Sequence, residues 1–231
     1  MKASRNRKIK IAIDGPAASG KSTTAQMVAR KLGYLYIDSG AMYRAVTLKA
    51  LQEGIPLDDE ERVARLAEAL KFEFRPGEEA PHLFVNGEDV SHLIRTPEVT
   101  RNIRPVAANP RVREILVARQ RQLGEQGGVV MDGRDITTVV FPDAELKIYM
   151  QASPEARARR RVEELRRRGI EADYEEVLEE ILQRDRDDQS RSHGPLTIAP
   201  DAVIVDTSQL TIDEQVDMIY RLALEKIHQA G

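Results

Sequence analysis

Hydrophobic residues along this chain fall into short runs separated by longer amphipathic segments. Five apolar runs have the length of strands buried on both faces: residues 9–14, 34–37, 129–131, 146–150 and 202–205. Short strands separated by helices are typical of a parallel sheet that helices cover on both faces. The pattern therefore predicts an α/β fold built on a five-stranded parallel sheet with flanking helices.

The segments between these strands carry apolar residues at helical spacing. Residues 23–32 are an example, with Ala25, Val28, Ala29 and Leu32 on one side. The same pattern predicts helices over residues 41–53, 61–70, 97–108, 110–125, 154–168, 174–189 and 212–227. Asp38-Ser39-Gly40 is a polar turn that can cap the helix over 41–53.

Residues 71–95 interrupt the alternation of strands and helices. Residues 72–74 alternate in polarity, a loop rich in Pro, Gly and Glu covers 75–81, and residues 82–85 form a second short run. Asn86-Gly87 is a strong hairpin signal, and residues 88–95 are expected to supply a third strand. This segment is predicted to be a small inserted antiparallel sheet, and such insertions often carry substrate specificity.

Composition and charge narrow the possible functions. Charged residues make up 32% of the 231, yet the net charge is only −3, which argues against nucleic acid or a membrane as the main partner. There is no cysteine, so disulfides and thiolate chemistry are excluded, and the four histidines show no metal-binding spacing. No apolar run approaches the ~20 residues that span a bilayer. Residues 1–8 are expected to form a basic flexible tail, and the protein is expected to be cytoplasmic.

The most informative motif directly follows the first predicted strand. Gly15-Pro16-Ala17-Ala18-Ser19-Gly20-Lys21-Ser22 fits the pattern G-x-x-x-x-G-K-[ST] of the phosphate-binding loop. Strand, loop and helix in this order direct backbone N–H groups and a positive helix end at a polyphosphate. Lys21 would reach the β- and γ-phosphates, and the Ser22 hydroxyl would ligate Mg²⁺. The alternative is an ordinary glycine-rich turn.

Two other predicted strands end in polar motifs, and parallel strands bring their carboxyl ends to one edge of the sheet. One ends at Asp38-Ser39-Gly40, with Arg44 shortly after it, and the other at Asp132-Gly133-Arg134-Asp135. In the second motif the arginine could grip a phosphate, the last aspartate could accept from an exocyclic amine, and the first could hold Mg²⁺ through its water. The alternatives are a strand-end ion pair and, for Arg44, a solvated helix position.

Two of the predicted helices are rich in arginine. The helix over 154–168 contains Arg157, Arg159, Arg160 and Arg161, which either pair with glutamates on a solvated face or close over a triphosphate as a mobile lid. Arg184, Asp188 and Arg191 are spaced i, i+4 and i+7, so they share one helix face. Phosphoryl transfer needs positioning and cations, which a loop lysine, Mg²⁺ and converging arginines would supply.

Together these motifs resemble those of the bacterial cytidylate kinases. The resemblance extends from residue 9 to about 227, and its most specific markers are Asp38-Ser39-Gly40-Ala41-Met42-Tyr43-Arg44, Asp132-Gly133-Arg134-Asp135 and the inserted sheet. It implies a monomeric P-loop nucleoside-monophosphate-kinase fold with a helical lid. It also implies transfer of the γ-phosphate of ATP to CMP or dCMP, with Mg²⁺ as cofactor.

The resemblance implies a role for each matching residue. Ser39, Arg44 and Arg134 would hold the CMP phosphate, Arg113 and Asp135 would read the cytosine, Asp188 with Arg184 would hold the ribose, and Arg191 would lie among the phosphates. ATP would be bound by Gly15, Pro16, Ala17, Ala18, Ser19, Gly20, Lys21, Ser22, Thr23, Arg157 and Arg161. Direct catalytic roles would fall to Lys21, Asp132, Arg160 and Arg184, and Mg²⁺ to Ser22 with Asp132 through water.

The resemblance also divides the chain into parts. The core would comprise residues 9–40, 106–153 and 190–231, the CMP-binding domain 41–105 with its small sheet at about 71–95, and the lid 154–189. One residue departs from the family pattern, because Arg104 stands where many bacterial members have a serine that contacts the base. Either Arg113 and Asp135 suffice for cytosine, or specificity is loosened, or the alignment is shifted, so the preference among CMP, dCMP and UMP stays open.

Three other classes of nucleotide-binding protein compete with this interpretation. An adenylate or uridylate kinase is disfavoured by the inserted sheet and by the motif at 132–135. A GTPase should show N-K-x-D, which is absent, and a motor ATPase should show Asp-Glu after four apolar residues, whereas Gly133 follows Asp132. A regulatory protein without turnover is disfavoured by the intact Lys21, Ser22 and arginine set.

Overall fold

The computed structural model describes residues 8–77, 81–167 and 169–229. The predicted basic tail at 1–8 therefore lies almost entirely outside the described residues. Within the described ranges, no helix is long and apolar enough to cross a membrane.

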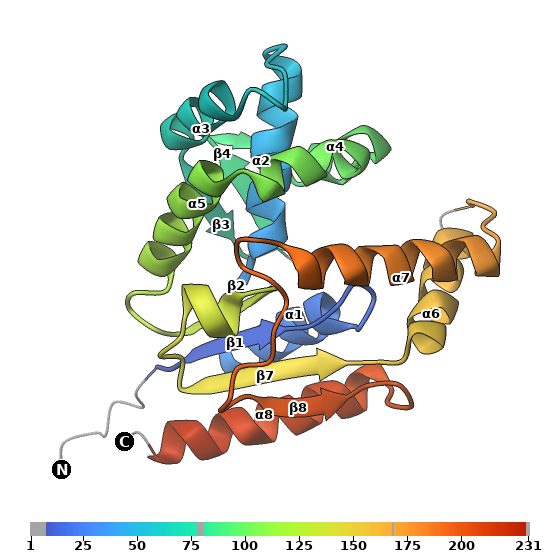
Figure 1. Cartoon of the computed structure of the whole chain (residues 1–231). Helices are drawn as coiled ribbons and strands as arrows, with labels where there is room; N and C mark the ends of the chain where they lie inside the picture. The colour runs from blue at the N-terminus through green and yellow to red at the C-terminus, as the bar shows by residue number, and fades with distance from the viewer. Residues whose placement is uncertain (1–7, 78–80, 168, 230–231) are drawn as a thin grey trace.

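The predicted parallel sheet of five strands is confirmed, with the strand order β2-β6-β1-β7-β8. Its strands are β1 (Lys10–Asp14), β2 (Leu35–Asp38), β6 (Val129–Gly133), β7 (Leu146–Gln151) and β8 (Val203–Asp206). All four pairings between neighbours are parallel. Because β1 lies between β6 and β7, the loop that follows it is at the middle of the sheet edge (Figure 1).

Alternating residues of β1 bury themselves in two different cores, as expected for a sheet covered on both faces. Ile11 and Ile13 are fully buried in the core that contains α1 (Lys21–Leu32) and α8 (Ile212–Gln229). Ala12 belongs to the opposite core, which is shared with α2 (Ser39–Gln52) and α5 (Pro110–Leu123). Each fully buried Ile or Leu contributes about 1.5–3 kcal/mol, so the two cores hold the strand ends in fixed positions.

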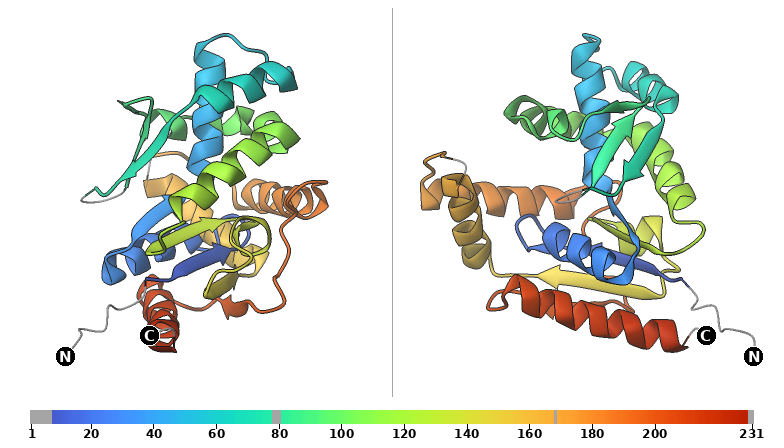
Figure 2. Two further views of the ribbon diagram at one scale, coloured as in Figure 1. Left: turned by 90° about the vertical axis from the view of Figure 1, so that its left-hand side faces the viewer. Right: turned by 180° about the vertical axis from the view of Figure 1, so that it is seen from behind.

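A second body lies above the sheet in Figure 1 and is seen from two more sides in Figure 2. Besides α2 and α5 it contains α3 (Glu60–Ala69), α4 (Pro97–Ala108) and an antiparallel sheet of β3 (Phe72–Arg75), β4 (His82–Val85) and β5 (Glu88–Asp89). The predicted inserted antiparallel sheet is thus confirmed.

The predicted third strand of this sheet is much shorter than expected. The sequence pattern indicated a strand over 88–95, whereas β5 ends at Asp89 and a 3₁₀ turn, η1, covers Leu93–Arg95. The Asp89 carboxylate accepts hydrogen bonds from the backbone N–H and hydroxyl of Ser91, at 2.9 and 2.6 Å. These bonds turn the chain away from the strand direction, as short polar side chains often do.

The remaining helices are α6 (Pro154–Arg167) and α7 (Tyr174–Ser190), which pack against each other beside the sheet edge. Two predicted helices begin two residues earlier than expected. The first starts at Lys21 rather than at residue 23, and α2 starts at Ser39 because Asp38 caps it by accepting from the Ala41 N–H at 3.0 Å. Both shifts bring motif residues into first helical turns.

One element had no prediction, a π-helical turn η2 over Ile136–Val140. It follows β6 directly and is held by Asp14 at the end of β1. The carboxylate of Asp14 accepts from the N–H of Ile136 at 2.9 Å, and from the N–H and hydroxyl of Thr137 at 2.8 and 2.6 Å. Asp14 therefore joins the start of the glycine-rich loop to the segment that follows Arg134 and Asp135.

Asp14 should make the stability of the fold depend on pH. Burial raises its pKa to about 6, although hydrogen bonds from Thr137 and Ile136 oppose the shift. Because this pKa is above the unfolded value, Asp14 stabilises the fold most below about pH 4 and less as the pH rises through 6. The advantage of the wild type over Asp14→Asn in free energy of unfolding should be greater at low pH, by roughly 3 kcal/mol at most. Urea unfolding at about pH 4 and about pH 7 measures it, and an equal advantage at both would contradict it.

Candidate active site

The glycine-rich loop connects β1 to α1 and is shaped by close backbone approaches. A Cβ at Gly15 would lie 2.2 Å from the carbonyl oxygen of Met150, so only glycine fits there. Gly20 has φ 92° and allows the sharp entry into α1, a conformation that costs other residues energy. The loop thus presents its N–H groups at the N-terminus of α1, the geometry suited to an anion.

Lys21 lies in the first turn of α1 with its side chain buried. Its ammonium donates to the carbonyl of Pro16 at 3.2 Å. Burial lowers the pKa of Lys21 to about 7, the positive charge of Arg134 adds to the shift, and the carboxylate of Asp132 opposes it. A phosphate oxygen at this place would relieve the cost of burying that charge.

Asp132 at the end of β6 is the acceptor for the loop hydroxyl. It is 2% exposed, its Oδ2 accepts from Ser22 at 2.7 Å, and its Oδ1 accepts from the phenol of Tyr36 at 2.7 Å. Burial raises the pKa of Asp132, the nearby Asp38 adds to the shift, and Lys21 opposes it. Tyr36, on β2, was missed by sequence reasoning because a tyrosine in a short apolar run gives no signal beyond strand propensity.

The hydroxyl and carboxylate pair of Ser22 and Asp132 suits Mg²⁺, a hard cation that binds oxygen and keeps several waters. Ser22 lines the open cleft, so its oxygen is accessible to an ion. Among the described residues no group of three or more His, Cys, Asp or Glu could hold a metal by itself. The donor set therefore fits a metal that arrives with phosphates.

The other strand-end motifs meet the loop as predicted. Ser39 is buried at the start of α2 and donates to the backbone carbonyl of Asp132 at 2.7 Å. A Cβ at Gly133 would lie 2.5 Å from the Ser39 oxygen, so the glycine permits this approach. Arg44 donates a hydrogen bond to the hydroxyl of Thr100 at 3.1 Å. Burial lowers the pKa of Arg44, the positive charges of Arg95 and Arg134 add to this shift, and the carboxylate of Asp38 opposes it.

Arg113 and Asp135 form a buried ion pair on this side of the cleft. Burial raises the pKa of Asp135, although Arg113 opposes the shift. Both side chains line the cleft. The pair offers a donor and an acceptor side by side, an arrangement that suits recognition of a polar ring edge.

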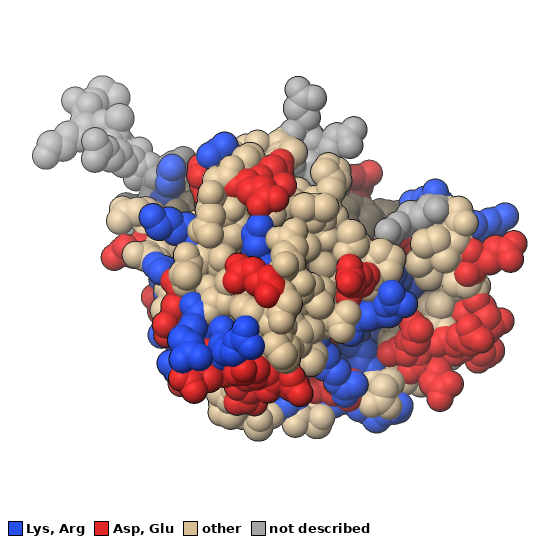
Figure 3. All heavy atoms as spheres, turned by 90° about the horizontal axis from the view of Figure 1, so that it is seen from above, with Lys and Arg blue, Asp and Glu red and all other residues tan. Residues whose placement is uncertain are grey.

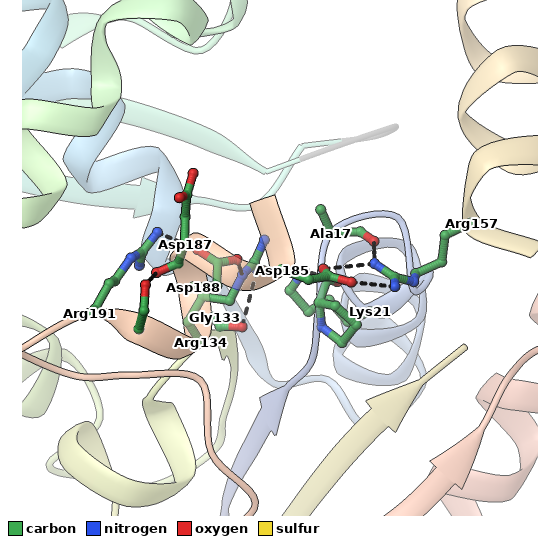
Figure 4. Close-up of polar contacts among 11 residues, drawn as sticks. Ala17, Lys21, Gly133, Arg134, Arg157, Asp185, Asp187, Asp188 and Arg191 are labelled. Atoms are coloured by element: carbon green, nitrogen blue, oxygen red, sulfur yellow. Dashed lines mark hydrogen bonds and ion pairs between the residues drawn. The ribbon is translucent and has the colours of Figure 1, made fainter. Parts of the chain in front are cut away.

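Of the three residues predicted to share a helix face, Arg184 and Arg191 line the same cleft, and Asp188 is buried. Asp188 lies between two arginines, as Figure 4 shows: Arg134 donates to it at 2.6 Å, and Arg191 bonds to its other oxygen. Burial alone would raise the pKa of Asp188, but Arg134 and Arg191 hold it below its usual value. Arg191 directly follows the end of α7.

Arg184, one turn earlier on α7, has no hydrogen bond or ion pair with another described residue. It lines the cleft and is open to its water. The surrounding protein lowers the pKa of Arg184 to about 10, and Arg134 adds to that effect while Asp188 opposes it. Among the described residues no carboxylate pairs with this cation, so an anionic ligand could bind to it.

The arginines of α6 separate into two groups. Arg160 and Arg161 line the cleft, and Arg160 also bonds to the carbonyl of Thr207. Arg157 instead is buried beside the loop, where it donates to Asp185 at 2.9 and 2.5 Å and to the carbonyl of Ala17 at 3.4 Å (Figure 4). Predicted phosphate contacts of Arg157 would therefore compete with its pairing to Asp185.

Arg104 is not one of the residues that line the cleft. Its guanidinium is 2.7 Å from the carboxylate of Asp187, with 72% of the Arg104 side chain exposed. The ion pair joins α4 to α7 across 83 positions of sequence, a contact that no pattern could predict. Arg95 and Asp38, also unpredicted as site residues, are 3.7 Å apart and both line the cleft.

These elements enclose a cleft of about 830 Å³, lined by the loop, the start of α2, the end of β6 with Arg134 and Asp135, arginines of α6, and Arg184 and Arg191 in and after α7. A volume of this size accommodates ligands larger than a single small anion. A parallel sheet with this loop between β1 and α1, a cationic cleft at the strand ends and a second body above it define a P-loop kinase.

Comparison with known proteins identifies the family. The model of the cytidylate kinase family matches residues 11–225. The cytidylate kinase of Ligilactobacillus salivarius (strain UCC118) is 51% identical over 222 residues, which cover 96% of this chain and 99% of that protein. That of Geobacillus thermodenitrificans (strain NG80-2) is 52% identical over 221 residues, with 96% and 99% covered. The chain belongs to the cytidylate kinase family, and it is an enzyme of that family.

A solved structure supports the fold independently. An uncharacterized protein from Eubacterium ventriosum ATCC 27560 superposes with a TM-score of 0.53 at 12% identity, with 94% of this chain and 98% of that chain covered. At this identity the similarity concerns the fold alone.

Removing Arg157 should destabilise the protein far more than removing Arg161. The Arg157 side chain is 3% exposed and that of Asp185 17%, so Arg157→Ala leaves a largely buried carboxylate without its partner. The expected loss is about 3 kcal/mol in free energy of unfolding. The matched control is Arg161→Ala, which breaks an exposed pair with Glu164 and should cost less than about 1 kcal/mol. Equal losses in urea unfolding would contradict this account.

Proposed function

We propose that the protein transfers the γ-phosphoryl group of ATP to CMP and dCMP, giving ADP and CDP or dCDP. The observation that carries this proposal is Arg184, which has no hydrogen-bond or ion-pair partner among the described residues. It lines the same cleft as the phosphate-binding loop and as Ser39, Arg44 and Arg134, and its charge acts on Lys21 as well as on Arg134. Two sets of groups suited to phosphate in one cleft fit a reaction between two phosphate esters. Family membership supports the choice of substrates.

The ATP phosphates would lie on the loop residues 15–23, with Lys21 directed at the β- and γ-phosphates. Arg161 would contact ATP from α6, since it already lines the cleft. For Arg157 a contact to ATP stays a prediction, because its side chain is buried beside the loop, where it pairs with Asp185. Ser22, with Asp132 through a water, would hold Mg²⁺, which supplies positive charge to the β- and γ-phosphate oxygens when bound.

The monophosphate would lie on the opposite wall of the cleft. Its phosphate would be held by Ser39, Arg44 and Arg134, with Arg191 close by. Arg113 and Asp135 would read the cytosine edge, because a guanidinium can donate to the ring acceptors while a carboxylate accepts from the exocyclic amine. Asp188 and Arg184 would hold the ribose.

In the chemical step an oxygen of the CMP phosphate attacks the γ-phosphorus of ATP. The bond from that phosphorus to the bridging oxygen breaks, and ADP leaves with the electron pair. Charge spreads over the equatorial oxygens of the transferring group, so catalysis rests on in-line positioning and on cations. Lys21, Arg160 and Arg184 are the cations we assign to that role, and no protein base is required.

The division into core, monophosphate-binding part and lid belongs to this proposal. Helices α6 and α7 would act as the lid, closing to exclude water that would otherwise hydrolyse ATP. On the face shown in Figure 3, Lys and Arg are interspersed with Asp and Glu, an arrangement that does not favour nucleic acid. We propose a cytoplasmic monomer acting on small nucleotides.

A coupled assay of ADP release tests the function, with ATP, MgCl₂ and each of CMP, dCMP, UMP, AMP and GMP. Strong stimulation by CMP and dCMP alone is expected, and would show that Arg104 does not impair cytosine recognition. Comparable rates with UMP would contradict the proposed roles of Arg113 and Asp135 in recognising cytosine. No stimulation by any monophosphate would overturn the proposed function.

Replacing Lys21 tests the phosphate-binding loop. Lys21→Ala should lower kcat by about 10³-fold, since it removes a preorganised cation from the transferring phosphoryl group. The fold should survive, because the substitution removes a charge that is costly to bury. Turnover and far-UV circular dichroism measure both effects, and near-normal turnover would refute the assignment.

Replacing Arg134 tests the monophosphate site. Arg134→Ala should weaken CMP by roughly 10- to 100-fold, the loss expected for a charge-assisted hydrogen bond, and ATP much less. Arg119→Ala, an exposed α5 residue, is the matched control and should change neither affinity. Calorimetric titration of each nucleotide decides the matter: an unchanged CMP affinity in Arg134→Ala argues against this role.

A further inference from the structure

Tyr36 occupies a place that the proposed mechanism does not use. It lies on β2 with 7% of its surface exposed, and its ring packs in the core shared by α1 and α8. Its phenol leaves that apolar environment to meet the carboxylate of Asp132 on the neighbouring strand, at 2.7 Å. A buried phenol that donates to a buried carboxylate is a specific interaction, because buried polar atoms such as this phenol and the Asp132 Oδ1 need hydrogen-bond partners.

The two oxygens of Asp132 have different partners. Oδ2 accepts from the hydroxyl of Ser22, a residue that lines the open cleft. Oδ1 accepts from the phenol of Tyr36, whose ring packs in the core. Rotation of the carboxylate would break both bonds at once. The Tyr36 phenol, fixed by its packed ring, therefore determines the orientation in which Asp132 meets Ser22.

We propose that Tyr36 is a positioning residue for the metal–nucleotide complex: it fixes the carboxylate of Asp132 so that Ser22 and Asp132 are preorganised to hold Mg²⁺ with the ATP phosphates. This inference rests on the proposed function, since it concerns the metal of that reaction. Groups that orient metal-binding residues commonly change metal affinity by 10- to 100-fold when they are removed.

A purely structural role for Tyr36 predicts a different result. If the ring served only to fill the core, the Tyr36→Phe enzyme would keep nearly all of its kinase activity, because the ring remains. Loss of the hydrogen bond would then lower stability without altering how Mg²⁺ affects nucleotide binding. The coupling between Mg²⁺ and nucleotide therefore separates the two roles.

The matched control is Tyr34→Phe. Tyr34 is two residues earlier, and its phenol accepts a hydrogen bond from the Ile9 N–H at 3.2 Å, away from the loop. Both substitutions remove one phenol oxygen and keep the ring. The control accounts for general effects of losing a tyrosine hydrogen bond beside β1.

The experiment measures ADP binding by calorimetry in excess MgCl₂ and in EDTA, for the wild type and both variants, with no monophosphate present. The ratio of the two ADP affinities should fall about 10-fold in Tyr36→Phe, with ADP affinity in EDTA unchanged. Tyr34→Phe should keep the wild-type ratio. In steady-state assays Tyr36→Phe should lower kcat and leave the KM for CMP unchanged.

An unchanged ratio in Tyr36→Phe, or an equal fall in both variants, would overturn the proposed role of Tyr36. Measuring CMP phosphorylation by the same wild-type preparation separates failure of the proposed role of Tyr36 from failure of the proposed function. With an active wild type, such a result overturns the role of Tyr36 alone. An inactive wild type overturns the proposed function, and this inference with it.

Discussion

The cleft gathers positive charge that the protein by itself only partly neutralises. Lys21, Arg44, Arg134 and Arg184 reach it from different segments. Burial lowers the pKa values of Lys21 and Arg44, the surrounding protein lowers that of the cleft-lining Arg184, and neighbouring arginines add to all three shifts. Cations this close, partly removed from water, repel one another. Anionic groups such as the phosphates of the proposed substrates would reduce this repulsion, so the same cations that repel one another would favour nucleotide binding.

Three buried carboxylates position the segments around this charge, and each acts from a defined place in the fold. Asp14 ties the end of β1 to η2, Asp132 joins β6 to Ser22 and Tyr36, and Asp188 joins α7 to Arg134. The parallel sheet brings the first two to one edge, because adjacent strands end at the same level there. The site is thus built from the rigid scaffold, while α6 and α7 add the outer arginines.

Much of this was predictable, because motifs and periodicity are local. The strands, most helices, the loop at 15–22 and the convergence of Ser39, Arg134 and Asp135 were expected from short segments in sequence. The partners of Arg157 and Arg104 were not, since Asp185 and Asp187 are reached only when separate helices pack together. Nor was Tyr36, whose role depends on β2 lying beside β6. Apart from the short β5 and the turn η2, what sequence patterns could not predict was which side chains pair with one another.

The most direct test of the central claim is the affinity of a bisubstrate ligand in which adenosine and cytidine are joined by five phosphates. If the two phosphate sites face each other in one cleft, calorimetry with MgCl₂ should show one ligand per protein. It should also show binding at least about 10²-fold tighter than ATP or CMP alone, because the linkage makes the second contact intramolecular. An affinity no higher than that of ATP would contradict the account, since the two sites would then not be joined in one cleft.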